Sequence, residues 1–191
     1  MSPAVRRLRA HEAELLRDVR LRALRDAPMA FGSTLAREEG YAPEKWERWA
    51  AESATGERQA IFIANPAAGM ASGVIDAEDA GLAHLYAMWV ARDARGTGAG
   101  RTLLDAVVAW ATERGAERLI TSVTEGNAAA AALYDGAGFR DTGRREPLGH
   151  SEAVVAVLER RLHERSGPGG RAARAGAARG QGPGGRGAAA P

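Results

Sequence analysis

The chain has 191 residues, no cysteine and a formal net charge of +2 from 26 basic and 24 acidic side chains. The missing cysteine excludes a disulfide scaffold, a thiol nucleophile and an iron–sulfur ligand set, while an apolar fraction of 45% is ordinary for a globular protein. No run of about 18 apolar residues and no secretion signal are visible, so we expect a cytoplasmic protein without a membrane span.

The basic charge is concentrated at the C-terminus. Residues 164–191 carry five arginines against one glutamate, together with nine glycines, eight alanines and three prolines, so residues 1–163 are left with a charge of −2. A segment of this composition cannot bury enough apolar surface to offset its ordering entropy, which predicts a disordered tail after one folded domain at 1–163. The alternative is an arginine–glycine arm for nucleic acid or acidic membranes. The nearly neutral domain does not favour nucleic-acid binding.

The first third of the domain predicts one short strand and two helices. Residues 4–9 are strand-like, and residues 11–27 repeat apolar side chains at helical spacing until Pro28. Residues 43–52 form the second helix, with a proline in its first turn. Between the helices, residues 29–41 are expected to be an irregular connector.

Three strands are predicted next. Residues 59–64 and 70–76 flank a turn and form a hairpin, and residues 82–91 are mostly apolar and therefore central. Period-two alternation places His84, Tyr86 and Met88 on one face of this strand and Leu85, Ala87 and Trp89 on the other.

A long amphipathic helix follows and ends at Gly115, and Asn127 can cap a further helix. The remaining elements complete a mixed α/β domain around a central sheet: a strand at 118–124, a helix at 128–135 and strands at 139–142 and 153–158.

A glycine-rich turn, residues 95–102 (RGTGAGRT), separates the central strand from the long helix. Unobstructed main-chain amides at a helix N-terminus suit a phosphate group. A P-loop would need glycine in place of Arg95 and lysine in place of Arg101. A dinucleotide fingerprint would need glycine at the Arg101 position, in the first βα turn. The turn therefore matches neither motif.

The turn does resemble the Q/R-x-x-G-x-G/A signature of the GNAT superfamily of N-acetyltransferases, with Arg95, Gly98 and Gly100 at the signature positions. Residues 127–139 (NAAAAALYDGAGF) resemble the second family stretch, N-x-x-A-x-x-L-Y-x-x-x-G-F. The resemblance covers residues 3–162. It implies an α/β fold in the order β-α-α-β-β-β-α-β-α-β-β, with a mixed, mostly antiparallel sheet and helices on both faces.

The resemblance implies acetyl-CoA as the acetyl-donor co-substrate. The loop amides would hold its diphosphate, and the end of the central strand would pair with its pantetheine arm, where this strand diverges from the strand at 118–124. The cofactor-binding residues implied are Met88, Trp89, Val90, Arg95, Gly96, Thr97, Gly98, Ala99, Gly100, Arg101, Thr102, Asn127 and Tyr134.

Tyr134 is the candidate general acid, because a phenol with an ordinary pKa of about 10 is protonated at neutral pH and can protonate a leaving thiolate. Family members use a glutamate near the fourth strand, or a water relay, as the base. Here that strand carries His84, whose imidazole is suited to proton transfer near neutral pH. The side chains of Tyr134 and His84 could instead have purely structural roles. Other candidates for the base are Glu38, Glu39, Glu78, Asp79 and Glu125.

The acceptor is expected to be a primary amine of a small molecule or a protein. By family analogy Phe31, Glu38 and Glu39 lie on the acceptor side, and the two carboxylates would suit a cationic amine. Without a cysteine, we expect direct attack in a ternary complex. Four scattered histidines predict no metal site. Dimers are frequent in the family, which allows a homodimer. The alternative function is a non-catalytic regulatory domain that binds acyl-CoA.

Overall fold

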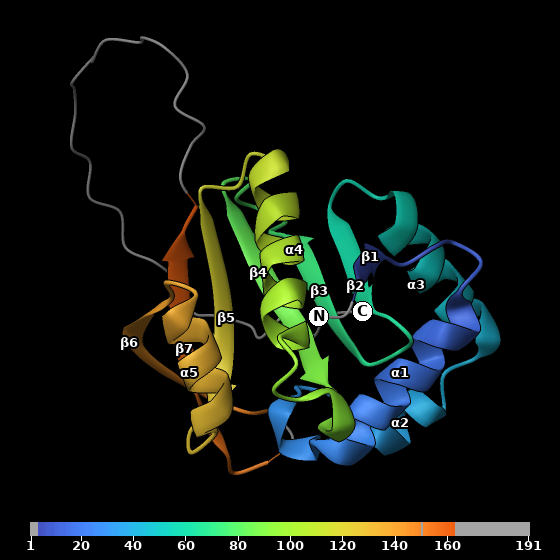
Figure 1. The fold of residues 1–191 in the computed structure, drawn as a ribbon, viewed down its shortest axis with the longest axis horizontal. Coiled ribbons are helices and arrows are strands. Elements are labelled where there is room, and N and C mark those ends of the chain that lie inside the picture. The colour runs from blue at the N-terminus through green and yellow to red at the C-terminus, as the bar shows by residue number, and fades with distance from the viewer. Residues whose placement is uncertain (1–3, 150, 163–191) are drawn as a thin grey trace, which may run out of the picture.

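The computed structural model describes residues 4–149 and 151–162 and contains one seven-stranded sheet with helices on both faces (Figure 1). Its elements in chain order are β1 (Val5–Arg7), α1 (Ala13–Asp26), the 3-10 turn η1 (Pro28–Ala30), α2 (Leu35–Glu39), α3 (Pro43–Thr55), β2 (Gln59–Ala64), β3 (Gly69–Ile75), β4 (Leu82–Val90), the 3-10 turn η2 (Arg92–Ala94), α4 (Ala99–Glu113), β5 (Arg118–Thr124), α5 (Ala128–Gly136), β6 (Arg140–Pro147) and β7 (Val154–Arg161). The strand order is β1-β2-β3-β4-β5-β7-β6, and only the β4–β5 pair is parallel. The expected fold class is confirmed. The predicted tail lies outside the described residues.

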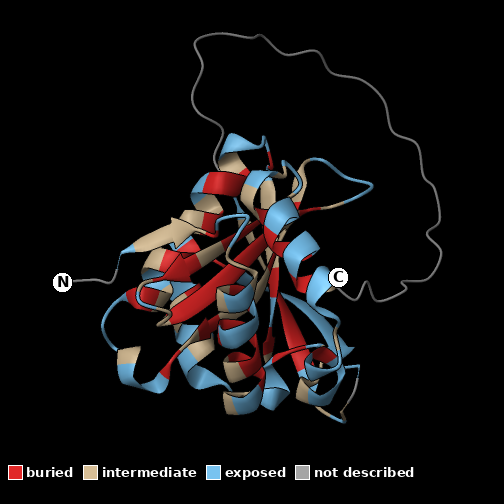
Figure 2. Ribbon diagram, turned by 90° about the vertical axis from the view of Figure 1, so that its right-hand side faces the viewer, coloured by how far each residue is buried: buried red, intermediate tan, exposed pale blue. Residues whose placement is uncertain are grey.

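The sheet separates two apolar cores (Figure 2). On one face, α4 contributes the fully buried Leu104 and Val107. On the other, Leu16 and Val19 of α1 pack with Trp46 of α3. Burying each such side chain contributes about 1.5–3 kcal/mol, so both helix layers are held firmly on the sheet, whose central strands β4 and β5 form the site.

The connector after α1 is more regular than predicted. It contains η1 and α2, where a loop was expected. The side-chain oxygen of Thr34 accepts a hydrogen bond from the Arg37 amide at 3.3 Å, which caps α2 at its N-terminus. Leu35 packs against the α1–α3 core and anchors the short helix.

The penultimate strand is longer than the pattern at 139–142 indicated. All eight residues of β6 are exposed, so no apolar alternation marks them. The strand forms because β7 supplies its hydrogen-bonding partner, with a register shift between Asp141 and Arg145. As an edge strand, β6 carries charged side chains that oppose pairing with other chains.

A bulge in β4 changes which face its side chains occupy. Ala87 has a φ of +52°, and the pairing with β3 shifts register beside it. Leu85 lies in the α4 core before the bulge, and Met88 and Val90 pack against that same core after it. Trp89 lies in the opposite core. The predicted strict alternation is therefore wrong from the bulge onward, where it assigned Ala87, Met88 and Trp89 to the wrong faces.

Candidate active site

The parallel strands β4 and β5 pair over only three residues. The last pair is His84 with Ile120. Beyond it, β4 continues to Val90 beside β3, and β5 continues to Thr124 beside β7. The two strands therefore separate beyond this pair, as the family resemblance implied, and the interval between their unpaired edges is called the slot below.

The two sequence motifs meet at the open end of this slot. A Cβ atom built on Gly100 would lie 3.4 Å from Leu133 Cδ2 and 3.6 Å from both Met88 Cε and Val90 Cγ2. The first turn of α4 therefore lies directly against the end of β4 and against α5. This packing places the glycine loop and the α5 motif on one site.

The loop before α4 presents main-chain amides. Gly98 has a φ of +88° and is the N-cap of α4, and the Thr102 amide makes the first helical bond, to the Gly98 carbonyl at 3.0 Å. The amides of Gly98, Ala99, Gly100 and Arg101 make no hydrogen bond with another described residue. These free donors, together with the helix dipole, form a nest for an anion.

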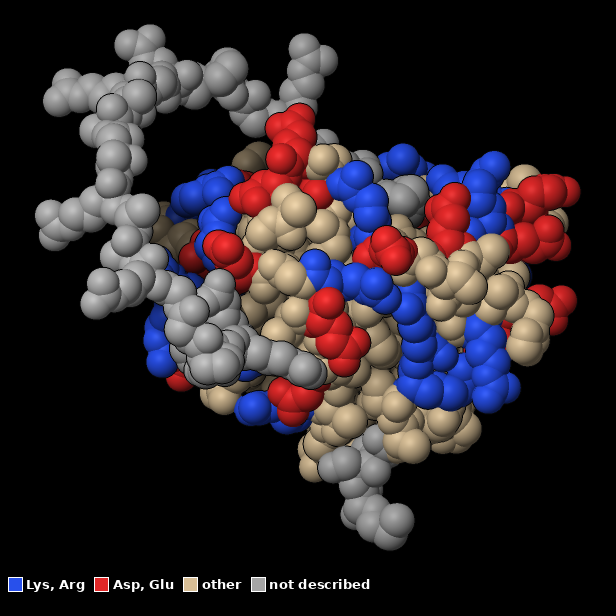
Figure 3. All heavy atoms as spheres, turned by 90° about the horizontal axis from the view of Figure 1, so that it is seen from above, with Lys and Arg blue, Asp and Glu red and all other residues tan. Residues whose placement is uncertain are grey.

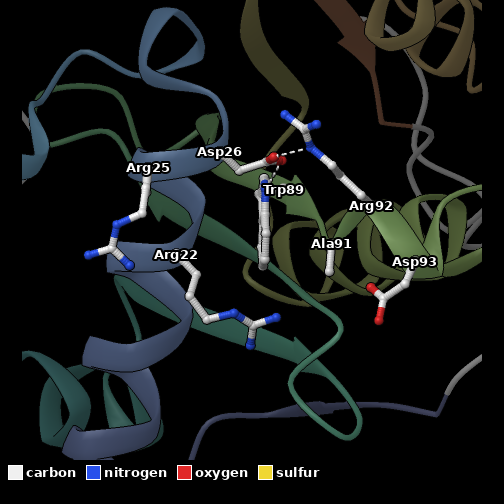
Figure 4. Close-up of a pocket in the computed structure, with 7 residues that line it drawn as sticks. All are labelled: Arg22, Arg25, Asp26, Trp89, Ala91, Arg92 and Asp93. Atoms are coloured by element: carbon white, nitrogen blue, oxygen red, sulfur yellow. Dashed lines mark hydrogen bonds and ion pairs between the residues drawn. The ribbon is translucent and has the colours of Figure 1, made fainter.

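An ionic clamp fixes this loop to α1, and Figure 4 shows the part of it in which Asp26 meets Arg92 and Trp89. Arg95 donates to the Val90 carbonyl at 3.1 Å and to Asp26 at 2.5 Å. Arg92 and the Trp89 indole also donate to Asp26, the indole at 3.1 Å. Burial raises the pKa of Asp26, but the hydrogen bonds from Trp89 and Arg92 outweigh this and hold it below its usual range. The side chain of Arg95 therefore positions the loop.

Arg101 and Asn127 join the surrounding elements. Arg101 Nε lies 2.9 Å from Asp105, and its Nη1 donates to the Gly136 carbonyl at 3.0 Å, which connects α4 to the end of α5. Asn127 Oδ1 accepts from the Ala130 amide at 3.2 Å, which confirms the predicted cap. A coenzyme contact by either side chain stays a prediction.

The candidate acid, Tyr134, is 4% exposed and packs against Phe139 at a centroid distance of 5.5 Å. Burial raises the pKa of its phenol to about 12, although hydrogen bonding with the Thr121 hydroxyl opposes the rise. The phenol is therefore protonated throughout the neutral range and is available as a donor.

The candidate base, His84, has a carboxylate partner. Its Nε2 lies 3.0 Å from Asp76 Oδ2, and its ring stacks on Tyr86 with planes 3° apart. Asp76 also accepts from the amides of Glu78 and Asp79. The Glu78 amide bond, followed by the bond to His84, lowers the pKa of Asp76. The carboxylate is thus ionised beside the imidazole.

Asp76 is the candidate site residue that the sequence pattern missed. It follows β3 directly, and the β3–β4 register sets Val74 opposite His84. A residue two positions beyond Val74 is a diagonal neighbour of the histidine. The hairpin register was the signal that could have identified it.

The three predicted acceptor residues do not share one environment. Glu38 is 2% exposed, and its two oxygens accept from Arg20 at 2.7 and 2.9 Å. The Arg20 guanidinium lies 4.9 Å from the centre of the Phe31 ring, which is also buried. Glu39 is exposed and pairs with Arg25 at 3.2 Å. Of these three residues, only Glu39 presents its carboxylate to solvent.

The connector nevertheless reaches the slot. Thr124, the last residue of β5, donates to the Met29 carbonyl in η1 at 2.6 Å. Met29 is 47% exposed. This contact places η1 beside the open end of β5, on the side expected to receive the acceptor.

Three features of the described residues bear on other functions. Within residues 4–149 and 151–162, no three potential metal-ligating side chains cluster together, and no helix is long and apolar enough to cross a bilayer. On the face in Figure 3, basic and acidic side chains are interspersed rather than gathered by sign.

The sequence profile of the Acetyltransferase (GNAT) family matches residues 21–139, more than half of the chain. The protein therefore belongs to the GNAT family of N-acetyltransferases. None of the curated proteins compared with it matches.

Solved structures with the same fold include a GNAT-family acetyltransferase from Streptococcus pneumoniae, at 20% identity and a TM-score of 0.70 over 83% of this chain and 99% of that one. The ribosomal-protein-alanine N-acetyltransferase from Brucella melitensis is 24% identical, with a TM-score of 0.68 over 83% and 99%. A Salmonella typhimurium protein solved with its cofactor acetyl-CoA is 17% identical, with a TM-score of 0.69 over 88% and 99%. At these sequence identities the structural similarities establish the fold.

Proposed function

We propose that this protein transfers the acetyl group of acetyl-CoA to a primary amine of a small molecule or protein, by direct attack in a ternary complex. The observation that carries the proposal is the packing of the loop with its free amides against the end of β4 and against α5, the helix that holds the buried and protonated Tyr134. The Salmonella relative was solved with acetyl-CoA, and the Brucella relative is named for an alanine of a ribosomal protein. Both agree with this reaction class.

The main chain of this site fits acetyl-CoA. The donor set at the start of α4 consists of N–H groups from Gly98 to Arg101, and a diphosphate is an acceptor of the right charge for them. The edge of β4 from Met88 to Val90 has no β5 partner and can pair with the amide groups of the pantetheine arm. Asn127 adds a side-chain amide at the start of α5.

The proposed base acts through the nitrogen that Asp76 leaves free. An ionised carboxylate only accepts hydrogen bonds, so the proton on the His84 ring lies on Nε2, toward Asp76. Nδ1 is then the acceptor for the proton that an ammonium substrate must lose before its nitrogen can attack. The adjacent carboxylate stabilises the imidazolium that results.

Tyr134 completes the proton balance. Acetyl transfer forms a C–N bond and breaks the C–S bond of the thioester, so the departing sulfur needs a proton. Burial keeps the phenol protonated, and we assign it as the donor to that sulfur. The nitrogen loses a second proton as it becomes the amide, and exchange with solvent takes up this proton and restores both His84 and Tyr134.

A thiol-release screen tests the function. Acetyl-CoA is supplied with peptides bearing free N-termini, lysine peptides, polyamines, amine antibiotics and small metabolites. We expect one class to stimulate thiol release. The Tyr134→Phe variant should lower kcat about 10²–10⁴-fold, the usual contribution of a general acid, while calorimetry shows undiminished acetyl-CoA binding. Binding without release in every class would overturn the proposal in favour of a regulatory acyl-CoA domain, and no binding at all would overturn both.

A further inference from the structure

One face of β5 is open, although this strand lies inside the sheet between β4 and β7. Leu119 and Val123 are buried in the core that α4 covers. Because side chains alternate along a strand, Ile120, Ser122 and Thr124 lie on the other face. There Ser122 is exposed, and Ile120 and Thr124 are only half-buried. We call these three residues the open strip.

The open strip begins at the proposed base and ends at the connector. Ile120 is the direct partner of His84 in the β4–β5 ladder, so the imidazole lies beside the start of the strip. At the other end, the Thr124 hydroxyl donates to the Met29 carbonyl at 2.6 Å. The strip is about 13 Å long, because a strand advances by about 3.3 Å per residue. An acceptor whose amine lies at His84 therefore reaches Met29 only if it is extended over this length.

Met29 presents an apolar side chain at the far end of the strip. It is 47% exposed, and the one other large apolar side chain that is exposed within the described residues is Val154, at 38%. Val154 shares a face of β7 with Ala156, which belongs to the α4 core, so it lies on the opposite face of the sheet. The Thr124 bond fixes the turn that carries Met29 and so holds an apolar contact at a set distance from His84.

The chemistry of the strip suits a peptide. Its side chains and that of Met29 carry no charge, so the further ammonium groups of a polyamine would find no carboxylate among them. Beyond Ile120, the edge of β5 that faces the slot has no β4 partner, and its main-chain groups can pair with an extended peptide. A peptide advances by the same distance per residue as the strand. With its terminal nitrogen at His84, its fourth residue lies beside Met29.

We propose that the acceptor is a peptide with a free N-terminus and an apolar side chain at its fourth residue, and that Met29 is the specificity-determining residue that contacts this side chain. The inference rests on the proposed acetyl transfer and on the amine lying at His84. The chemistry is unchanged: the terminal nitrogen forms the C–N bond, and the C–S bond of the thioester breaks. Thr124 positions Met29 and touches no reacting atom.

Short serine–glycine peptides with one leucine test the distance. The leucine is placed at the second, fourth or sixth residue, positions that share one face of an extended chain, and a peptide without leucine is the reference. We expect the highest kcat/KM for the fourth position, roughly tenfold above the other peptides, the effect of partly burying a leucine side chain. Equal values for all peptides, or a maximum at another position, would overturn the inference.

Three variants test the residues. Met29→Gln keeps the length of the side chain and removes the apolar contact, so the preference for leucine at the fourth residue should fall to within about twofold. Thr124→Val frees the turn and should lower the preference about threefold or more, and Thr124→Ser should restore it. Val154→Gln is the matched control on the other face and should keep the full preference. A full preference in Met29→Gln would overturn its role, and one in Thr124→Val would refute the positioning by Thr124.

Failure of this inference differs from failure of the proposed function. Thiol release with polyamines, with small amines or with lysine in N-terminally blocked peptides, but with no free N-terminus, overturns the inference and leaves the function standing. No release with any amine overturns both. Thermal melting checks that each variant is folded, and Met29→Ser carries the same test if Met29→Gln does not fold.

Discussion

The loop before α4 and the connector after α1 are two irregular segments beside the same slot, and they present different groups. From Gly98 to Arg101 the loop leaves its main-chain amides free, whereas the side chains of Arg95 and Arg101 bond to the protein. From Phe31 to Glu39 the connector turns its aromatic ring and one carboxylate inward. Binding groups of the main chain can be predicted from the spacing of glycines in the sequence. The function of a side chain depends instead on its partners elsewhere in the chain.

Glu38 shows this dependence. As part of a sequence, the adjacent Glu38 and Glu39 are equivalent acidic residues facing an acceptor. In the fold, Glu38 is neutralised by Arg20 on α1 and Glu39 remains in solvent. The two glutamates thus provide a matched pair for testing the comparison between the segments.

The largest effect is expected from Glu38→Gln. Removing one partner of a buried ion pair leaves an uncompensated charge and costs about 3–5 kcal/mol of unfolding free energy. Glu39→Gln removes an exposed pair worth less than about 1 kcal/mol. Urea unfolding of both variants measures the difference. If Glu38→Gln were as stable as the wild type and raised the acceptor KM, its carboxylate would serve the substrate and the contrast between the two segments would fail.

A smaller effect is expected from Gly98→Ala, which tests the nest. A φ of +88° strains an L-residue by about 1–2 kcal/mol, and relief of this strain would turn the amides away from the anion. We expect a KM for acetyl-CoA raised roughly tenfold, since each 1.4 kcal/mol is tenfold in affinity.

Gly115→Ala is the matched control for the nest. Gly115 follows the other end of α4 and has a φ of +82°, so alanine there costs similar stability far from the glycine loop. Its acetyl-CoA KM should equal that of the wild type. An equal rise in both variants would show that the loss of affinity comes from α4 stability and that the nest of amides does not bind acetyl-CoA.

The smallest effect is expected from Asp26→Asn, which weakens the clamp on the loop. We expect a loss of about 1 kcal/mol at pH 7, in the range for hydrogen bonds to charged groups. Because the folded-state pKa of Asp26 is lowered, its contribution is complete above the unfolded-state pKa of about 3.9 and is lost as the pH falls through the folded-state value.

Denaturant unfolding at a series of pH values measures this contribution. The stability difference between the wild type and Asp26→Asn should shrink as the solution becomes acidic. Asp93→Asn is the control, because Asp93 lines the same hollow (Figure 4) and forms no ion pair with another described residue. A difference independent of pH would show that Asp26 acts through packing rather than through its charge.

Most of the fold was predictable, because its signals are local. Apolar periodicity located α1, α3, α4 and the strands β2 to β5 to within a few residues. Prediction failed where the stabilising contact is distant: β6 exists only as a partner of β7, and α2 depends on Leu35 reaching the α1–α3 core. The bulge at Ala87 was also missed, since period-two alternation assumes an unbroken ladder.

The same distinction between local and distant contacts separates the parts of the candidate site that the sequence predicted from those that it did not. The amino-acid sequence by itself determined the glycine loop, the α5 motif and the family, because main-chain conformation is encoded by neighbouring residues. Only the tertiary structure paired Asp76 with His84, buried Glu38 against Arg20 and joined the Thr121 hydroxyl to the Leu85 carbonyl. Each of these contacts joins residues from different elements, and the direction of a side chain is decided by the partner that satisfies it.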